Sequence, residues 1–440
     1  MNDPAPLDGT AGAPETALAG ALASRRAIGA LAVLTLVNLV NYLDRYVISA
    51  LVPDLKRAGM GTDFALGLLV PGFLVVYFMA APVFGLLGDR ARRTRSIGLG
   101  VLLWSAATAA SGFARNYLQL LATRACVGIG EAAYGTIAPS LLADYFPLAM
   151  RGRVFAVFGL AIPVGSALGF VVGGLIDHLY GWRAAFWVAG IPGALLGLWV
   201  LRLPEPVRGM HDPPATAPPA ALGVRPALAL YARLIRARPY RLTVLGYAAY
   251  TFALGGLAFW MPTFLERMRG LPALQATTGF GLIVVLTGLV GTLAGGWLGD
   301  YALRFSRQAH LWVSGVLTVL AVPCAVLALA AAAPTLYWTG MVAAELLLFM
   351  STGPINSAIV SLVTPTERAS AVALSVFTIH LLGDTLSPPL IGALSDRSNL
   401  ALAVQVVPIA VALSGVLWLL AARAGGALSP DPARAARAIR

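Results

Sequence analysis

The sequence has few of the residues from which soluble domains, disulfide scaffolds and metal sites are built. Only 11% of its 440 residues are charged and 58% are hydrophobic, whereas about a quarter of the residues in a soluble domain are charged. It has two cysteines, one lysine and four scattered histidines. Cys126 and Cys324 lie far apart within apolar runs, so we expect packing roles without a disulfide, a metal or any cofactor.

Several catalytic motifs are also absent from the sequence. It has no Walker sequence, so we do not expect ATP hydrolysis to be its energy source. It has no HExxH pair and no strand–turn–helix serine elbow, which argues against a membrane enzyme acting on lipids. We therefore do not expect an enzyme. A receptor that binds a ligand without moving it stays open as an alternative.

Long apolar runs fill almost the whole chain. A run of about 20 residues is long enough to cross a bilayer as a helix, and helices satisfy their own backbone hydrogen bonds in lipid. The sequence therefore predicts an all-α membrane protein with about twelve transmembrane helices. The predicted spans are 28–53, 64–87, 96–114, 117–143, 152–177, 183–202, 241–265, 273–302, 309–331, 335–362, 369–395 and 399–422.

The net charge of +12 is distributed unevenly over the predicted loops. In a twelve-span arrangement most arginines fall on one side, and such an excess is typical of the cytoplasmic side. We therefore expect both termini in the cytoplasm, contacts with anionic membrane lipids, and no nucleic-acid partner. The strong preference for Arg over Lys is typical of a bacterial genome rich in G and C, which suggests a bacterial inner membrane. The opposite side carries only Lys56, Arg57, Arg115, Arg183, Arg267, Arg269 and Arg397.

One long polar segment, 203–240, divides the spans six and six. We expect a disordered cytoplasmic N-terminus at 1–27, a six-helix bundle at 28–202, a cytoplasmic linker at 203–240, a second bundle at 241–422 and a cytoplasmic tail at 423–440. Within the linker, apolar residues near Leu234 share one helix face, so a short interfacial helix and a loosely structured linker are both open.

The two halves contain paired sequence repeats. "GLLGD" ends the second span at Asp89, and "GWLGD" ends the eighth at Asp300. "GGLID" ends the fifth span at Asp177, and "GALSD" ends the eleventh at Asp396. Paired motifs in corresponding spans predict parallel repeats around an axis along the membrane normal, as in the major facilitator fold.

Several stretches resemble the major facilitator superfamily. The segment from Gly85 to Arg93 resembles its signature loop, and Arg124 with Gly128 and Gly130 resembles its fourth-helix motif. More narrowly, the chain resembles the Spinster-like branch in "NYLDRYVISALVPDL", "GEAAYGTIAPSLLADYFP", "GLAIPVGSALG" and "GDTLSPPLIGALSD". The resemblance implies a secondary transporter working by alternating access. Animal members of the branch move sphingosine-1-phosphate and lysophospholipids.

The signature loop suggests a latch on the cytoplasmic side. The resemblance implies that it holds the outward-facing state. Asp89 could pair with Arg90 or Arg93 and also face the positive N-terminus of the eleventh span, which starts near Ala369. Asp300 is the equivalent in the second half, where the loop is degraded and a weaker latch is expected. The alternative is that these residues, with Gly85, only cap helices and set topology.

Ionisable residues inside the predicted spans suggest a proton site. Arg124 and Glu131 share one helix face at i and i+7, with Gly128 between them. A buried carboxylate stays ionised beside a guanidinium and favours its protonated form away from one. Asp44 and Arg45 place a carboxylate and a guanidinium in the first span as well. We therefore expect one network, in which Arg124 returns Glu131 to its ionised form. A static ion pair that fixes helix packing is the alternative.

Further titratable residues lie in the second half. His380 and Asp384 share a face at i and i+4 and could couple transport to protons. Alternatively, Asp384 satisfies backbone groups freed by the following prolines. Glu345 stands alone in an apolar span, as a second proton site or a buried protonated carboxyl. Asn356 belongs to a polar stretch that looks like a cavity wall.

The remaining candidate cavity residues are mostly aromatic, which favours an amphiphile with an apolar tail and a charged head. The candidate substrate-binding residues are Arg45, Tyr42, Tyr46, Tyr134, Glu345 and Asn356. We therefore expect a monomeric, proton-coupled carrier of a lipid-like amphiphile, of lysophospholipid or sphingoid type. The alternative cargo is a small organic anion or a drug.

Overall fold

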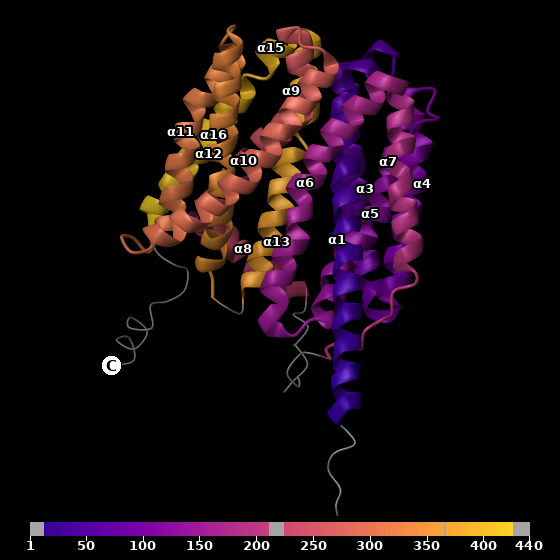
Figure 1. The fold of residues 1–440 in the computed structure, drawn as a ribbon. Helices are drawn as coiled ribbons and strands as arrows, with labels where there is room; N and C mark the ends of the chain where they lie inside the picture. The colour runs from indigo at the N-terminus through magenta and orange to yellow at the C-terminus, as the bar shows by residue number, and fades with distance from the viewer. Residues whose placement is uncertain (1–12, 211–223, 365–366, 426–440) are drawn as a thin grey trace, which may run out of the picture.

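The computed structural model describes residues 13–210, 224–364 and 367–425, and every regular element within these ranges is a helix (Figure 1). The first half contains α1 (Ala13–Arg57), α2 (Asp63–Gly67), α3 (Leu69–Arg90), α4 (Arg93–Ser111), α5 (Tyr117–Tyr145), α6 (Leu148–Tyr180) and α7 (Trp182–Val200). The second half contains α9 (Arg238–Arg269), α10 (Ala273–Ala302), α11 (Ala309–Ala330), α12 (Pro334–Ser361), α13 (Arg368–Ile379), the π-helix η2 (His380–Asp384), α14 (Ser387–Arg397), α15 (Leu400–Ala403) and α16 (Val406–Ala424). Between the halves lies α8 (Val224–Arg236).

Each of the twelve predicted spans coincides with a helix or with consecutive helices. The second span consists of α2 and α3, the eleventh of α13, η2 and α14, and the twelfth of α15 and α16. Among the described residues, ten candidate spans meet the length and hydropathy that a membrane crossing needs. The other two, α4 and α5, are also 19 and 29 residues long but carry more polar residues. The chain is an all-α, multi-pass membrane protein.

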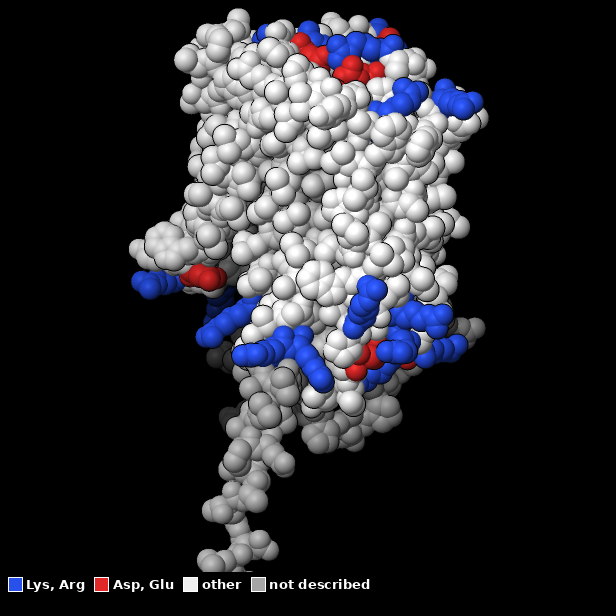
Figure 2. Space-filling view, turned by 45° about the vertical axis from the view of Figure 1, so that its right-hand side comes forward, with Lys and Arg blue, Asp and Glu red and all other residues white. Residues whose placement is uncertain are grey.

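Charged side chains gather at the two ends of the helices. Figure 2 shows Lys, Arg, Asp and Glu at both ends of the molecule, with an uncharged belt between them on the face in view. One end contains Arg93, Arg151 and Arg304, and we call it the arginine-rich side. The other contains Asp63, Arg267 and Asp396, and we call it the opposite side. The belt is what a helix bundle needs to face hydrocarbon.

The helices form two bundles, α1 to α7 and α9 to α16, which stand side by side in Figure 1. One predicted boundary differs in the structure. The first helix begins at Ala13, well before residue 28, because residues 13–27 are rich in alanine, the strongest helix former. For the linker, where a helix and a loose segment were both open, α8 covers 224–236. Residues 211–223 and 426–440 lie outside the described residues.

The linker helix α8 packs on the second bundle. Leu234 is fully buried in an apolar cluster with Tyr240, Val244 and Ala371, whereas Ile235 is half exposed. This contact favours the helical alternative for the linker and ties its C-terminal part to α9 and α13.

The two bundles meet at the opposite side, where α2 packs on α14 and α1 on α9, while α6 runs against α10. Gly67 and Gly392 permit the α2–α14 contact, because a Cβ atom would come within 2.6 Å of Pro388 O at Gly67 and within 2.3 Å of Asp63 O at Gly392. Only glycine allows backbones to approach this closely. The structure is therefore closed at the opposite side.

Candidate functional site: a charged cluster beside the central cavity

Two ion pairs join α1 to α5 in the first bundle. Arg45 Nε donates to Glu131 Oε2 at 2.7 Å, and Arg124 Nη1 donates to Asp44 Oδ1 at 3.0 Å. Arg124 Nη2 also donates to the Asp44 carbonyl oxygen at 3.3 Å. Each helix therefore contributes one carboxylate and one guanidinium. When all four side chains are ionised, their net charge is zero.

This pairing differs from the expected one. Arg124 and Glu131 do not form the direct pair predicted from their i, i+7 spacing, because each reaches across to α1 instead. Arg124 and Glu131 lie seven residues apart on α5, whereas their partners Asp44 and Arg45 are adjacent on α1. The prediction that all four residues belong to one arrangement agrees with these contacts.

Glycines on α5 bring its neighbours close. A Cβ atom at Gly128 would lie 2.6 Å from Phe73 O on α3, and one at Gly130 would lie 2.4 Å from Gly100 O on α4. The close approach at Gly128 is therefore made by α3. On the α4 side, Thr108 Oγ1 donates to Asp44 Oδ2 at 2.5 Å.

The two carboxylates differ in how completely they are satisfied. Asp44 accepts from Arg124 and Thr108, whereas Glu131 uses only Oε2 and leaves its buried Oε1 without a hydrogen-bond partner. The Glu131 side chain is 0% exposed and that of its partner Arg45 is 26% exposed. A buried carboxylate held by a single contact loses most of its stabilisation when that contact breaks. Glu131 is therefore the carboxylate of the cluster that depends on a single side-chain contact.

Arg45 lies at the junction of two cavities of about 270 and 290 Å³. Both cavities are lined by Tyr42, Arg45, Leu74 and His380. The larger one also reaches Glu131 and Tyr134, and the smaller one is lined in addition by Arg124 and Asp384. Together they follow the boundary between the bundles.

Aromatic rings surround the Arg45 guanidinium. Its Cζ lies 5.1 to 5.5 Å from the ring centres of Tyr42, Phe73 and Tyr77, a distance at which a cation is attracted to a π-face. Tyr46 lines the smaller cavity and packs on Phe170 at 5.3 Å. The rings hold the cation at the cavity wall while leaving part of it accessible.

His380 and Asp384 face this cluster from the second bundle. His380 Nδ1 lies 2.8 Å from Asp384 Oδ2, and the His380 ring lies 5.7 Å from that of Phe78 on α3. Both residues belong to η2, and π-helical turns within α-helices are frequent at functional sites. Asp384 is therefore paired with His380. A backbone group of the same segment, the Ile379 carbonyl oxygen, accepts a hydrogen bond from Thr251 Oγ1 at 3.0 Å.

Two predicted substrate residues, Glu345 and Asn356, line neither cavity, and a third, Tyr134, borders only the larger one. Glu345 is buried in α12 and lines neither cavity. Asn356 Nδ2 donates to Thr352 O at 2.8 Å and to Tyr247 Oη at 3.3 Å, also away from the cavities. Tyr134 borders the larger cavity, but its hydroxyl donates to Leu34 O at 2.8 Å. Glu345 and Asn356 therefore do not meet the charged cluster in this conformation.

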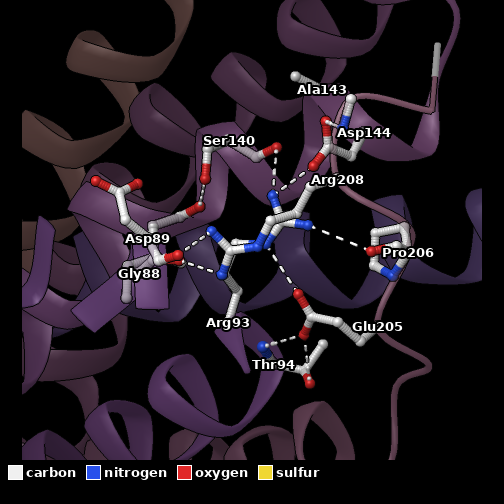
Figure 3. Close-up of polar contacts among 12 residues, drawn as sticks. Gly88, Asp89, Arg93, Thr94, Ser140, Ala143, Asp144, Glu205, Pro206 and Arg208 are labelled. Carbon is white, nitrogen blue, oxygen red and sulfur yellow. Dashed lines mark hydrogen bonds and ion pairs between the residues drawn. The ribbon is translucent and has the colours of Figure 1, made fainter. Parts of the chain in front are cut away.

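The predicted latch is rearranged at the arginine-rich side. Arg93 is buried and pairs with Asp144 at 2.5 Å and with Glu205 at 2.8 Å (Figure 3). Within the described part of the chain, the carboxylate of Asp89 has no hydrogen-bond or ion-pair partner. The expected pairing of Asp89 with Arg90 or Arg93 is therefore wrong for this conformation, because two other carboxylates hold Arg93.

The segment that follows α7 clamps the same loop. Arg208 donates to the carbonyl oxygens of Gly88, Asp89 and Ala91 at 2.7, 2.5 and 2.8 Å, as Figure 3 shows in part. Glu205 accepts from the backbone N–H and the hydroxyl of Thr94, both at 3.0 Å. The loop between α3 and α4 is thus fixed by the start of the linker, which sequence reasoning missed. The signal available in the sequence was the segment "PEPVR", which places Glu205 and Arg208 directly after the sixth span.

The pKa of Glu205 reflects this clamp. Burial raises the pKa of the Glu205 carboxyl. Hydrogen bonds from the Thr94 backbone, Arg93 and the Thr94 hydroxyl lower this pKa by a larger amount, so its net shift is downward.

The remaining predicted latch residues make few contacts. In the second half, Asp300 is 79% exposed, and the one polar contact of its side chain among the described residues is with His310 at 3.4 Å. Gly85 lies near Thr136, and a Cβ atom there would be 3.7 Å from its methyl group.

Comparison with known proteins identifies the family. The model of the Major Facilitator Superfamily matches residues 34–383. The chain is 34% identical to protein spinster homolog 3 of Danio rerio over 406 residues, covering 88% of this chain and 80% of that protein. The chain belongs to the Spinster branch of the major facilitator superfamily.

One further relative agrees with this assignment, and one solved structure shares the fold. The Spinster chain is 33% identical to the sphingosine-1-phosphate transporter SPNS2 of Xenopus tropicalis, covering 90% of this chain and 82% of that one. A solved bacterial homologue of the human lysosomal transporter Spinster, in an inward-facing and unoccupied conformation, has a TM-score of 0.81 at 22% identity, covering 91% of this chain and 97% of that one. This Spinster protein is a membrane transporter and not an enzyme.

Proposed function

We propose that this Spinster protein is a proton-coupled secondary transporter of a single-chain amphiphile, of lysophospholipid or sphingoid type. The observation that supports this most is the position of Arg45. Its guanidinium faces both cavities while its Nε holds buried Glu131 at 2.7 Å. A charged headgroup and a proton can therefore act on the same ion pair.

The coupling follows from competition for Arg45. An anionic headgroup that binds the Arg45 guanidinium weakens its bond to Glu131. Among the described residues Arg45 is the only partner of Oε2, and Oε1 has none, so the buried carboxyl binds a proton once Arg45 has moved away. When the substrate leaves, Arg45 returns and the proton is released. Asp44 and Arg124 remain paired and keep α1 against α5.

The cavity walls suit an apolar tail. The smaller cavity has Leu69, Val70, Phe73 and Phe259 among its lining residues, and these come from both bundles. Ligand pockets of this kind are mostly apolar with a few placed polar groups. The names of the relatives support a lipid-like cargo, since one is a sphingosine-1-phosphate transporter.

We also propose the orientation and the moving parts. The arginine-rich side faces the cytoplasm of a bacterial cell, with both termini there, because positively charged loops stay inside. The bodies that alternate are 28–202 and 241–422, and the protein acts as a monomer. With the halves joined at the opposite side, the conformation described here is inward-facing.

A small organic anion is the second candidate cargo. Cavities of about 270 and 290 Å³ are each slightly smaller than the ~300–1,000 Å³ typical of ligand pockets. A compact anion would fit one of them and could use Arg45 in the same way.

Flux into proteoliposomes distinguishes the two cargoes. Purified full-length protein is screened by thermal shift with lysophospholipids, sphingoid bases and dicarboxylates, and the stabilising compounds are then assayed for transport. We expect a lysolipid or sphingoid base to stabilise the protein and to be transported. Arg45→Gln should reduce that flux by about tenfold or more, the cost of losing a charged contact. Arg95→Gln, on the exposed start of α4, is the matched control. Stabilisation and flux with dicarboxylates alone would assign the second cargo.

A further inference from the structure

The linker helix α8 is fixed at the arginine-rich end of the second bundle (Figure 1). Leu230, Tyr231 and the buried Leu234 pack on α9, α12 and α13. Arg233 pairs with Glu367, which immediately precedes α13. One face of α8 is therefore used to hold the helix on the bundle, and the other face points away from it.

Three arginines at the junction of α8 and α9 take no part in this attachment. Arg236 follows Leu234 by two residues, which is about 200° round the helix, so it lies on the face that points away from the bundle. Arg238 and Arg241 belong to the first turn of α9. All three residues are exposed, and their side chains have no hydrogen-bond or ion-pair partner in the part of the chain that the structure describes. They are free to bind a group from outside the protein.

The exposed face of α9 becomes apolar within the next turn. Arg238, Arg241 and Leu245 follow one another at i, i+3 and i+7, so they share one face of the helix. Leu245 is 38% exposed and lies deeper in the membrane span that begins at Arg238. On α8, Ile235 is 50% exposed. Guanidinium groups therefore border apolar side chains at the end of a membrane span, an arrangement typical of a helix that meets lipid headgroups.

The charge of this surface favours an anionic partner. The segment from Arg233 to Arg241 contains four arginines and no acidic residue, and Arg368 is exposed at the start of α13. Glu367 is already bound to Arg233 and leaves the other arginines uncompensated. A soluble anion would neutralise this charge but leave the neighbouring apolar side chains in water. An anionic phospholipid offers both a phosphate for the guanidinium groups and an acyl chain for the apolar residues.

We propose that the end of α8 and the first turn of α9 bind an anionic phospholipid from the leaflet at the arginine-rich side. Arg236, Arg238 and Arg241 hold the phosphate headgroup, and Leu245 contacts the acyl chain. The lipid ties α8 to the membrane, while the packing of α8 ties it to α13, which continues into η2 and His380 at the central cavity. A structural lipid thus anchors a helix that leads to the substrate site, whatever the cargo is.

Native mass spectrometry tests this site on the purified full-length protein, in detergent micelles that contain equal amounts of phosphatidylglycerol and phosphatidylcholine. The wild type should retain phosphatidylglycerol in preference to phosphatidylcholine. The triple variant Arg236→Gln, Arg238→Gln and Arg241→Gln should lower the ratio of the two retained lipids by up to about fivefold for each arginine removed, which is what one basic residue contributes to binding an anionic membrane surface. Added salt should lower the wild-type ratio, because the site is exposed.

Two matched variants separate this site from net charge and from side-chain truncation. Arg25→Gln, Arg26→Gln and Arg95→Gln together remove the same charge from exposed positions on the first bundle and should leave the lipid ratio as in the wild type. Lysine in place of arginine at the three α8–α9 positions keeps the positive charge and should keep most of the preference. Equal retention of both lipids by the wild type, an unchanged ratio in the α8–α9 glutamine variant, or an equal fall in the first-bundle variant would overturn the proposal.

Discussion

Arg45 and Glu131 meet in a 2.7 Å ion pair between α1 and α5, with the guanidinium at the cavity wall and the carboxylate fully buried. In the neighbouring pair the charges are exchanged: α1 supplies the carboxylate of Asp44, and α5 supplies the guanidinium of Arg124. The cluster therefore combines a fixed pair, satisfied on several sides, with a pair that a ligand can open. This difference is the basis of the proposed coupling.

The pairing of the four charges can be tested by stability. Arg124→Ala strands the buried Asp44 carboxylate and should lower the unfolding free energy by about 3–5 kcal/mol. Adding Asp44→Asn should recover much of this loss, because the uncompensated charge is removed. Adding Glu131→Gln should recover little. Thermal unfolding of the purified variants in detergent provides the comparison, and equal recovery by both second changes would contradict the pairing.

The close contact of α4 and α5 depends on Gly130. A Cβ atom there would lie 2.4 Å from Gly100 O and 2.7 Å from Trp104 N. Gly130→Ala must displace a backbone and should lower the unfolding free energy by about 1–3 kcal/mol. Gly159→Ala, where nothing lies within 4 Å of the added atom, is the matched control. Equal melting temperatures for the two variants would show that the helices do not pack as described.

Closure at the opposite side depends on the contact of α2 with α14. Gly392→Ala should push these helices apart, because the new methyl group would lie 2.3 Å from Asp63 O. We expect a shift toward the outward-facing population and a lower flux, measured by spin-label distances across that side. Gly296→Ala, with open space around the added atom, should behave as wild type. A distance distribution unchanged by Gly392→Ala would remove this interface as the closing element.

The linker clamp should weaken in acid. The folded protein lowers the pKa of Glu205, so its ionised form stabilises the clamp above the ordinary carboxyl pKa, and this stabilisation disappears as pH falls through the lowered value. The protection of residues 88–94 against hydrogen exchange, taken relative to the intrinsic exchange rate at each pH, should therefore fall on acidification. Glu205→Gln should show fast exchange already at neutral pH and a smaller further change. Asp300→Asn, at an exposed position, is the control, and exchange in Glu205→Gln as slow as in wild type would contradict the clamp.

The sequence predicted the helices and most charged positions, but not which charges meet. Hydropathy gave all twelve spans because the bilayer imposes a minimum apolar length. The spacing of Arg124 and Glu131 on one helix gave a shared face, yet it carried no information about the neighbouring helix. The tertiary packing of α5 against α1 decided that both residues reach α1.

The same limit explains the other differences. Arg93 was expected to pair within its own loop, but Asp144 and Glu205 lie 51 and 112 residues away in sequence. No local pattern reports such distant partners. The repeat ending in Asp177 and Asp396 was visible in the sequence, whereas the contact of Asp396 with the backbone of α2 required the structure.

The central claim is that Glu131 exchanges the proton that drives transport. The most direct measurement is uptake of the identified substrate into proteoliposomes under an imposed pH gradient, with Glu131→Gln compared to wild type. Gln mimics the protonated carboxyl, so folding and substrate binding should be retained. One charge moved through the membrane field is worth ~2.3 kcal/mol per 100 mV, which is enough to drive accumulation. We predict that the pH gradient stimulates wild-type uptake and leaves Glu131→Gln uptake unchanged, whereas undiminished stimulation of Glu131→Gln would contradict the claim.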